Sequence, residues 1–115
     1  MKGVAVLDRA TAETYAGWFR ALADPTRVQI LNLLASSGAP MTVGQIVEQV
    51  DVGQSTVSAH LKVLTEARFV LAEPRGTARL YQVNRRCVSC FPTAADVVMG
   101  RGVLPFAAVT CETAQ

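Results

Sequence analysis

The chain has 115 residues, of which 50% are hydrophobic, 17% charged and 6% aromatic, and its net charge is +2. This length supports one domain over residues 1–115 and is too short for two cores. The small net charge excludes a polybasic protein that binds nucleic acid indiscriminately, but it allows a specific binder with local cations. No apolar run reaches the roughly 18 residues of a membrane span, and the first residues are charged too soon for a signal peptide. We therefore expect a cytoplasmic protein.

An aromatic stripe marks the first predicted helix, over residues 10–22. Its large apolar residues recur at steps of three and four, which places them on one helix face: Tyr15, Trp18, Phe19 and Leu22. Such a face usually packs into the core of its own chain. It also suits dimerisation, because a small domain can complete its burial against a second copy of itself.

Local capping signals place the next helices. Asp24 can cap a helix that begins at Pro25, where the missing N–H costs nothing. Residues 42–45 fit a capping box that opens a short helix. The turn that follows contains Gly53, which can adopt a positive φ, and a second short helix comes after it. This arrangement predicts a helix-turn-helix over residues 42–67, whose second helix enters a DNA groove.

The second helix of this unit has an outward face suited to DNA. Its buried side is predicted by one stripe, formed by Val57, Leu61 and Leu64. The opposite side offers Ser55, Ser58 and Lys62, small hydroxyls and one cation that can approach base edges and phosphates. An ordinary amphipathic helix with a polar outer side is the alternative, and the neighbouring elements decide between the two.

Three other polar residues of this helix have two interpretations each. Gln54 and Thr56 lie at its N-terminus, where they either contact DNA or cap the helix. His60 lies beside the apolar stripe, where it either contacts a phosphate or packs with its polar atoms satisfied.

Residues 69–83 change to a β-type pattern. Two short apolar segments flank residues 74–77, whose composition predicts a turn with Arg75 at the tip and Arg79 on the return strand. A hairpin directly after a recognition helix is a wing, and its cations can reach phosphates beside the helix. The full predicted DNA-contacting set is Gln54, Ser55, Thr56, Ser58, His60, Lys62, Arg75 and Arg79. The remaining segment, 84–115, carries the cysteines, and a capping pattern at Thr93 predicts a short apolar helix with Val97 and Val98.

Two stretches resemble the ArsR/SmtB family: residues 19–34, which contain Asp-Pro-Thr-Arg, and residues 54–64. With the wing, the resemblance covers about residues 15 to 85. It implies a fold that is mainly α with a small β-hairpin, a homodimeric winged helix-turn-helix. It also implies a transcriptional repressor, not an enzyme, that leaves double-stranded operator DNA when a metal ion or metalloid binds. Many members dimerise through their first and last helices, which assigns the interface to Tyr15, Trp18, Phe19, Val97 and Val98.

Two effector sites of that family are missing from this chain. One arsenic site uses a Cys-Val-Cys run before the recognition helix, but residues 42–48 contain no thiol. A site for zinc-like ions takes Asp and His ligands from the last helix. Here Asp96 stands alone, because His60, the only histidine, lies in the recognition helix. Borderline ions such as Zn(II) are therefore not expected.

The three cysteines are the remaining candidates for an inducer site. Cys87 and Cys90 form a Cys-x-x-Cys pair, and an odd count in a reducing compartment argues against a disulfide framework. An all-sulfur donor set that includes Cys111 selects thiophilic species, As(III) or Hg(II), with Sb(III), Cd(II) and Pb(II) behind them. Arg85 and Arg86 directly precede the pair and would lower the pKa of its thiols.

Several alternatives stay open for these thiols. All three can be plain buried residues, and Cys111 can join from the same chain, from a partner or not at all. Without Cys111, a two-coordinate site would favour Hg(II). A redox sensor, in which Cys87 and Cys90 form a disulfide that releases DNA, is the leading alternative function. For metal(loid) binding, the predicted switch acts at the base of the wing and changes the separation of the two recognition helices.

Overall fold

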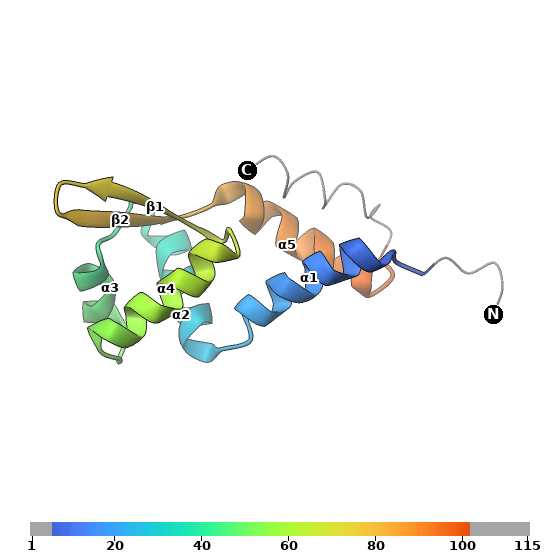
Figure 1. The fold of residues 1–115 in the computed structure, drawn as a ribbon, viewed down its shortest axis with the longest axis horizontal. Helices are drawn as coiled ribbons and strands as arrows, with labels where there is room; N and C mark the ends of the chain where they lie inside the picture. Colours follow the sequence, from blue (N-terminus) through green and yellow to red (C-terminus); the bar gives the residue numbers. More distant parts are fainter. Residues whose placement is uncertain (1–5, 102–115) are drawn as a thin grey trace.

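The computed structural model describes residues 6–101, including all of their side chains except those of residues 87–90 and 92. The elements in chain order are α1 (Arg9–Ala21), α2 (Pro25–Ser37), α3 (Val43–Gln49), α4 (Gln54–Glu66), β1 (Val70–Arg75), β2 (Ala78–Val83) and α5 (Arg85–Val98) (Figure 1). The predicted fold class, mainly α with a small hairpin that forms a winged helix-turn-helix, is confirmed. Among the described residues, no helix has the length and apolarity needed to cross a bilayer.

The helix starts show which capping signals were correct. The Asp24 carboxylate accepts from the backbone N–H groups of Thr26 and Arg27, and Pro25 is the first residue of α2. The capping box of α3 forms between Thr42 and Gln45 in both directions. The expected positive φ at the next turn is wrong, because the glycine there has a φ of −75° and serves as the N-cap of α4.

The predicted start of the last helix at Thr93 is also wrong. The helix α5 begins eight residues earlier, at Arg85, where the side chain of Asn84 accepts from the backbone N–H of Arg86. It then continues through Pro92, where one helical hydrogen bond is missing because proline has no backbone N–H. Ala94 is fully buried and Phe91 packs against the core, so tertiary packing of this face outweighs the local cost of the proline.

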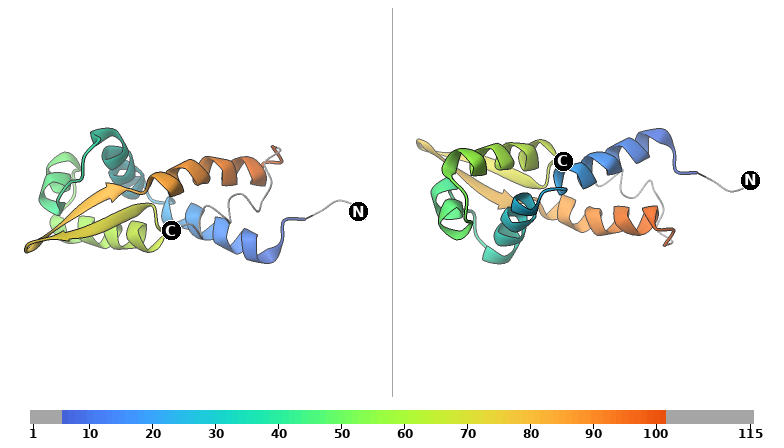
Figure 2. Two further views of the ribbon diagram at one scale, coloured as in Figure 1. Left: turned by 90° about the horizontal axis from the view of Figure 1, so that it is seen from above. Right: turned by 90° about the horizontal axis from the view of Figure 1, so that it is seen from below.

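The molecule consists of a body and an arm. The body contains α2, α3, α4 and the hairpin, whereas α1 and α5 extend away from it together (Figures 1 and 2). Three aromatic rings join the arm to the body. The ring centroid of Phe91 on α5 lies 5.3 Å from the ring centroid of Phe19 on α1. It lies 5.6 Å from the ring centroid of Phe69, the residue before β1. These edge-on contacts fix the arm at the base of the hairpin.

The hairpin is tighter than its composition predicts. The register pairs Val70 with Val83 and Arg75 with Ala78, so Pro74 and Arg75 belong to β1 and the turn is Gly76-Thr77. Gly76 has a φ of 63°, which a two-residue hairpin turn requires. On its outer side, β2 is held to the body by two backbone hydrogen bonds between Tyr81 and Met41, at 2.8 and 2.9 Å. This bridge fixes the hairpin relative to the helix-turn-helix.

Arg68 occupies a position where glycine is usual. Its φ is 69°, directly after α4, and the backbone N–H of Phe69 donates to the carbonyl of Leu64 in a Schellman-type helix end. We expect Arg68→Gly to raise the free energy of unfolding by about 0.5–1 kcal/mol, because relief of the Cβ clash exceeds the added entropy of the unfolded chain. Urea denaturation measures this gain. Arg75→Gly, within a strand, is the control and should destabilise; a loss for Arg68→Gly would contradict the prediction.

Candidate DNA interface and the cysteine segment

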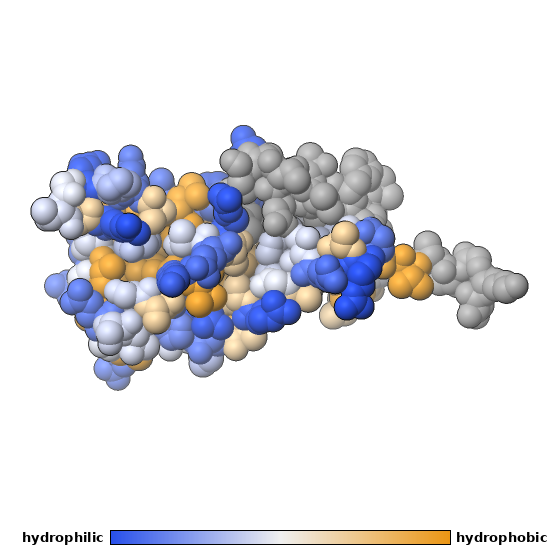
Figure 3. Space-filling model, viewed as in Figure 1, coloured by the Kyte–Doolittle hydropathy of each residue, from blue (hydrophilic) through white to orange (hydrophobic). Residues whose placement is uncertain are grey.

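The buried and exposed sides of α4 are those that its sequence predicts. Val57, Leu61 and Leu64 are buried in the core. Ser55, Ser58 and Lys62 lie on the opposite, exposed side. Apart from Ala59 and Glu66, the outer side of the helix therefore presents hydroxyl groups, one amide and one ammonium group to solvent. Figure 3, drawn from the same side as Figure 1, shows a mostly hydrophilic face with smaller apolar patches.

The N-terminus of α4 leaves its polar residues unused as caps. Gly53 is the N-cap and provides no side-chain hydrogen bond to the helix. Gln54 and Thr56 are both exposed in this first turn. The first backbone N–H groups of a helix have no partner within the helix, so this end can donate hydrogen bonds to an anion such as a phosphate.

A groove of about 300 Å³ joins α4 to the wing. Ser58, Lys62 and Glu66 line it from the helix, and Arg79 and Tyr81 line it from β2. The structure thus brings together Ser58, Lys62 and Arg79, which the sequence had selected separately. Tyr81 was missed, although the two-residue alternation of a strand places it on the same face as Arg79. Arg75 lies on the other face of the hairpin, at its tip.

The placement of His60 favours its packing role. Its side chain is only 17% exposed, and its Nδ1 lies 3.2 Å from Nη1 of Arg27 on α2. Its Nε2 lies 3.8 Å from Oδ1 of Asp24. His60 is therefore engaged with the N-terminus of α2, on a different side of α4 from the serines.

The carboxylate of Asp24 makes the stability of the fold depend on pH. The backbone N–H of Arg27 is the main cause that lowers the pKa of Asp24, with further contributions from His60 and the N–H of Thr26. Because the pKa of Asp24 is lower in the folded state, its ionised carboxylate stabilises the fold at pH values above its unfolded-state pKa of about 3.9. This stabilisation is lost as the pH falls through the folded-state pKa. We expect Asp24→Asn to lower stability at pH 6 and to differ less from wild type at pH 3, in urea unfolding. Asp51→Asn, at an exposed turn, is the control; parallel pH profiles for wild type and Asp24→Asn would contradict the expectation.

The residues predicted for the dimer interface fall into two groups. Tyr15 and Trp18 are 1% and 4% exposed, so they belong to the core of the single chain. Phe19 and Val97 are half-buried, and Val98 is 48% exposed near the end of α5. Among the described residues of the two arm helices, the exposed large apolar side chain is therefore Val98 on α5, and none lies on the aromatic face of α1.

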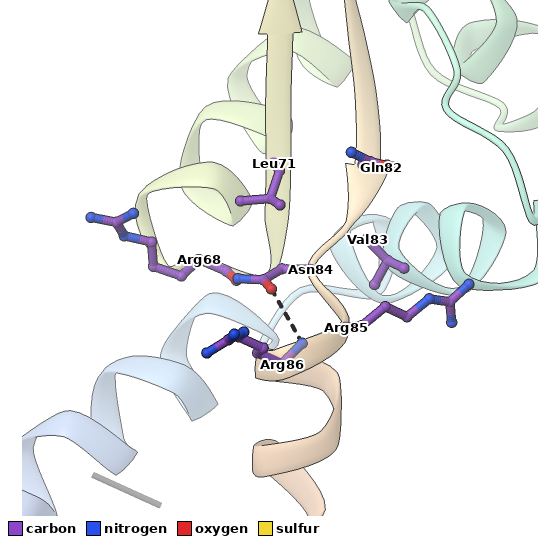
Figure 4. Close-up of a pocket in the computed structure, with 7 residues that line it drawn as sticks. All are labelled: Arg68, Leu71, Gln82, Val83, Asn84, Arg85 and Arg86. Atoms are coloured by element: carbon purple, nitrogen blue, oxygen red, sulfur yellow. Dashed lines mark hydrogen bonds between the residues drawn. The ribbon is translucent and has the colours of Figure 1, made fainter. Parts of the chain in front are cut away.

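A basic cleft of about 530 Å³ lies at the base of the hairpin, and none of the described residues that line it is acidic. Arg68 and Arg86 reach to one side of the hairpin base and Arg85 to the other, around Asn84 (Figure 4). The cysteine pair follows directly in the chain. The backbone places Cys87 and Cys90 in the first two turns of α5, but their side chains, and all of Cys111, lie outside the described residues. Among the described side chains, no group of three His, Cys, Asp or Glu could hold a metal ion.

Residues 24–71, from the cap of α2 into β1, match the family described as bacterial regulatory protein, arsR family. The HTH-type transcriptional regulator Rv2034 of Mycobacterium tuberculosis is 37% identical over 89 residues, which cover 77% of this chain and 81% of that one. This chain belongs to the arsR family. As an arsR-family protein it is a DNA-binding transcriptional regulator and not an enzyme, as predicted.

Other arsR-type relatives carry more specific names. A probable mercury resistance operon repressor of Streptomyces lividans is 36% identical, over 76% of this chain and 63% of its own length. An arsenical resistance operon repressor of Bacillus subtilis is 37% identical, over 61% of this chain and 66% of its own length. A solved homodimeric winged helix-turn-helix DNA-binding domain of Mycobacterium bovis, Mb0332, has a TM-score of 0.65 and 29% identity, covering 87% of this chain and 91% of that one.

Proposed function

We propose that this arsR-family regulator is a cytoplasmic transcriptional repressor that binds operator DNA as a homodimer and is released by a thiophilic metal(loid), As(III) or Hg(II). The main support for DNA binding is the arrangement of α4 beside the wing. The exposed hydroxyl and ammonium groups of α4 share a groove with Arg79 of the wing, which creates one surface for a DNA groove and its phosphates. The residues assigned to this contact are Gln54, Ser55, Thr56, Ser58, Lys62, Arg75 and Arg79, with His60 as the weakest member.

A homodimer accounts for the apolar end of the arm. Val98 and Met99 are 48% and 75% exposed, and a second α5 would cover them. The homodimeric state given for the solved relative supports the same arrangement. Two copies related by a twofold axis would present two α4 helices to two half-sites of a palindromic operator. In this proposal residues 1–115 form one winged-helix domain.

The inducer site is assigned to the cysteines. Positions 87 and 90 are three residues apart in α5, so they are neighbours on one helix face, a spacing that would allow both thiols to bind one soft ion. The arginines of the adjacent basic cleft favour the thiolate form that binds such ions. The names of the mercury and arsenical relatives support this class of inducer. Convergence of the thiolates, with or without Cys111, would tighten the junction of β2 with α5 and shift the two reading helices.

The test measures DNA affinity with and without the inducer. A duplex selected by the wild-type protein from a random pool serves as the operator, and fluorescence anisotropy under strict reduction gives the affinity. We expect saturating As(III) or Hg(II) to weaken wild-type binding about 10- to 100-fold, within the usual range of allosteric coupling. Cys90→Ser should lose this response, whereas Ser89→Ala, its neighbour in α5, should keep it.

Three other results would refute or replace parts of this proposal. An equal response of wild type and Cys90→Ser would refute the cysteine site. Release by mild peroxide together with loss of two free thiols, without any metal response, would replace metal sensing with the redox alternative. Selection of no DNA sequence by the wild-type protein would refute the repressor itself.

A further inference from the structure

The side chain of Arg27 connects the end of α1 to the start of α2. Its Nε donates to the carbonyl of Ala21 at 2.6 Å, and its Nη2 donates to the carbonyl of Arg20 at 3.4 Å. These carbonyls belong to the last turn of α1, where helical carbonyls lack partners within the helix. Only residues 22–24 separate the two helices, so Arg27 clamps the joint between the arm and the body.

The same guanidinium reaches the recognition helix. Its Nη1 lies 3.2 Å from Nδ1 of His60, 33 residues later in the chain. A guanidinium can only donate, so this contact is a hydrogen bond in the tautomer whose Nδ1 accepts and whose ring proton is on Nε2. That nitrogen faces the carboxylate of Asp24, at 3.8 Å, which favours this tautomer. The histidine and arginine therefore form one ordered link from α1 through α2 to α4.

We propose that Arg27 is a positioning residue that sets the angle between the dimer-forming arm and the recognition helix, acting through His60. This inference rests on the proposed dimeric repressor, because the angle matters only when two copies must fit one operator. The ring of Phe91 contacts Phe19 in the last turn of α1 and Phe69 at the hairpin base, whereas Arg27 binds the carbonyls of the same turn from the start of α2. The aromatic rings attach this turn to α5 and the hairpin base, and Arg27 attaches it to α2, so loss of Arg27 leaves the angle between α1 and α2 without its side-chain contact.

Small changes in this angle have large effects at the DNA. The 13 residues of α1 span about 20 Å. A tilt of about 10° at the joint moves the far end of such an arm by roughly 3.5 Å, close to the 3.4 Å rise of one base pair. A dimer displaced by this amount would no longer fit two half-sites at fixed spacing, so its affinity for the two-half-site duplex would fall. Its affinity for a single half-site would stay the same.

This difference provides the experiment. Wild type, Arg27→Gln, His60→Ala and the double variant are compared on a duplex selected by the wild type, with both half-sites, and on a duplex with one half-site scrambled. Arg20→Ala is the matched control, since it removes a charge from the same joint without removing a clamp contact. Dimer content and the unfolding midpoint are measured for every variant. Arg27→Lys replaces Arg27→Gln if the latter does not fold.

We expect Arg27→Gln to bind the two-half-site duplex about tenfold more weakly and the one-half-site duplex unchanged, a loss within the range of allosteric coupling. The double variant should be no weaker than Arg27→Gln, because both changes break one link. Equal losses on both duplexes would show a DNA contact or general destabilisation and overturn the inference, as would additive losses or an equal loss for Arg20→Ala. Failure of the wild type to select any sequence would refute the repressor proposal instead.

Discussion

Replacing Phe69 with alanine is expected to lower the free energy of unfolding by about 3–5 kcal/mol. Its side chain is fully buried, and its ring meets that of Phe91 edge-on at 74°. Truncation leaves a cavity and removes the ring contact that joins α5 to the hairpin base. Domains of this size are stable by roughly 5–15 kcal/mol, so the variant should be close to unfolding.

Urea denaturation at low temperature checks this expectation. Leu71→Ala is the control, because Leu71 is nearby in β1 but partly exposed on the outer face of the hairpin. Its substitution should change stability by only about 0.5 kcal/mol. A loss below about 1 kcal/mol for Phe69→Ala would mean that the aromatic contacts do not hold the arm.

Lys62→Glu is expected to weaken operator binding about 100-fold, or roughly 3 kcal/mol, without changing the fold. Lys62 is exposed on α4 and shares the groove with Ser58 and Arg79. The substitution removes a cation from the DNA surface and places a carboxylate against the phosphates. Fluorescence anisotropy at fixed salt measures the affinity, and circular dichroism checks the fold.

Arg9→Glu is the matched control for Lys62→Glu. It changes the net charge by the same amount, but the Arg9 side chain is 89% exposed on α1, where its ion pair is with Glu13. A similar loss of DNA affinity in both variants would mean that net charge, and not a local contact of Lys62, causes the effect. An unchanged affinity for Lys62→Glu would contradict the assignment of α4 to the DNA-binding surface. The milder Lys62→Gln should lose less than Lys62→Glu.

Local chemistry made much of the fold predictable. The caps at Asp24 and Thr42 depend on hydrogen bonds within four residues, so their patterns could be recognised without the tertiary structure. The outward face of α4 could likewise be predicted from the helical spacing of its apolar residues, which is a local pattern. The fold class followed from the order of these elements together with the family resemblance.

Features that depend on distant partners were not predictable. The start of α5 was placed too late, because the packing of Phe91 and Ala94 carries the helix through Pro92. The link between Arg27 and His60 joins residues 33 positions apart, and no local pattern indicates it. Composition also misplaced Pro74 in a turn, although the register puts it in a strand. The thiol site stays a prediction, since its side chains lie outside the described residues.

The position of Pro74 affects how the hairpin behaves in a crowded solution. A two-stranded sheet has two open edges, and each can template the addition of a strand from another molecule. Met41 occupies the middle of the β2 edge. On β1, the alternation of the ladder turns the backbone of Pro74 toward the open edge, where a residue without an N–H cannot pair. A solvent-exposed wing can therefore stay free for DNA while resisting edge-to-edge aggregation.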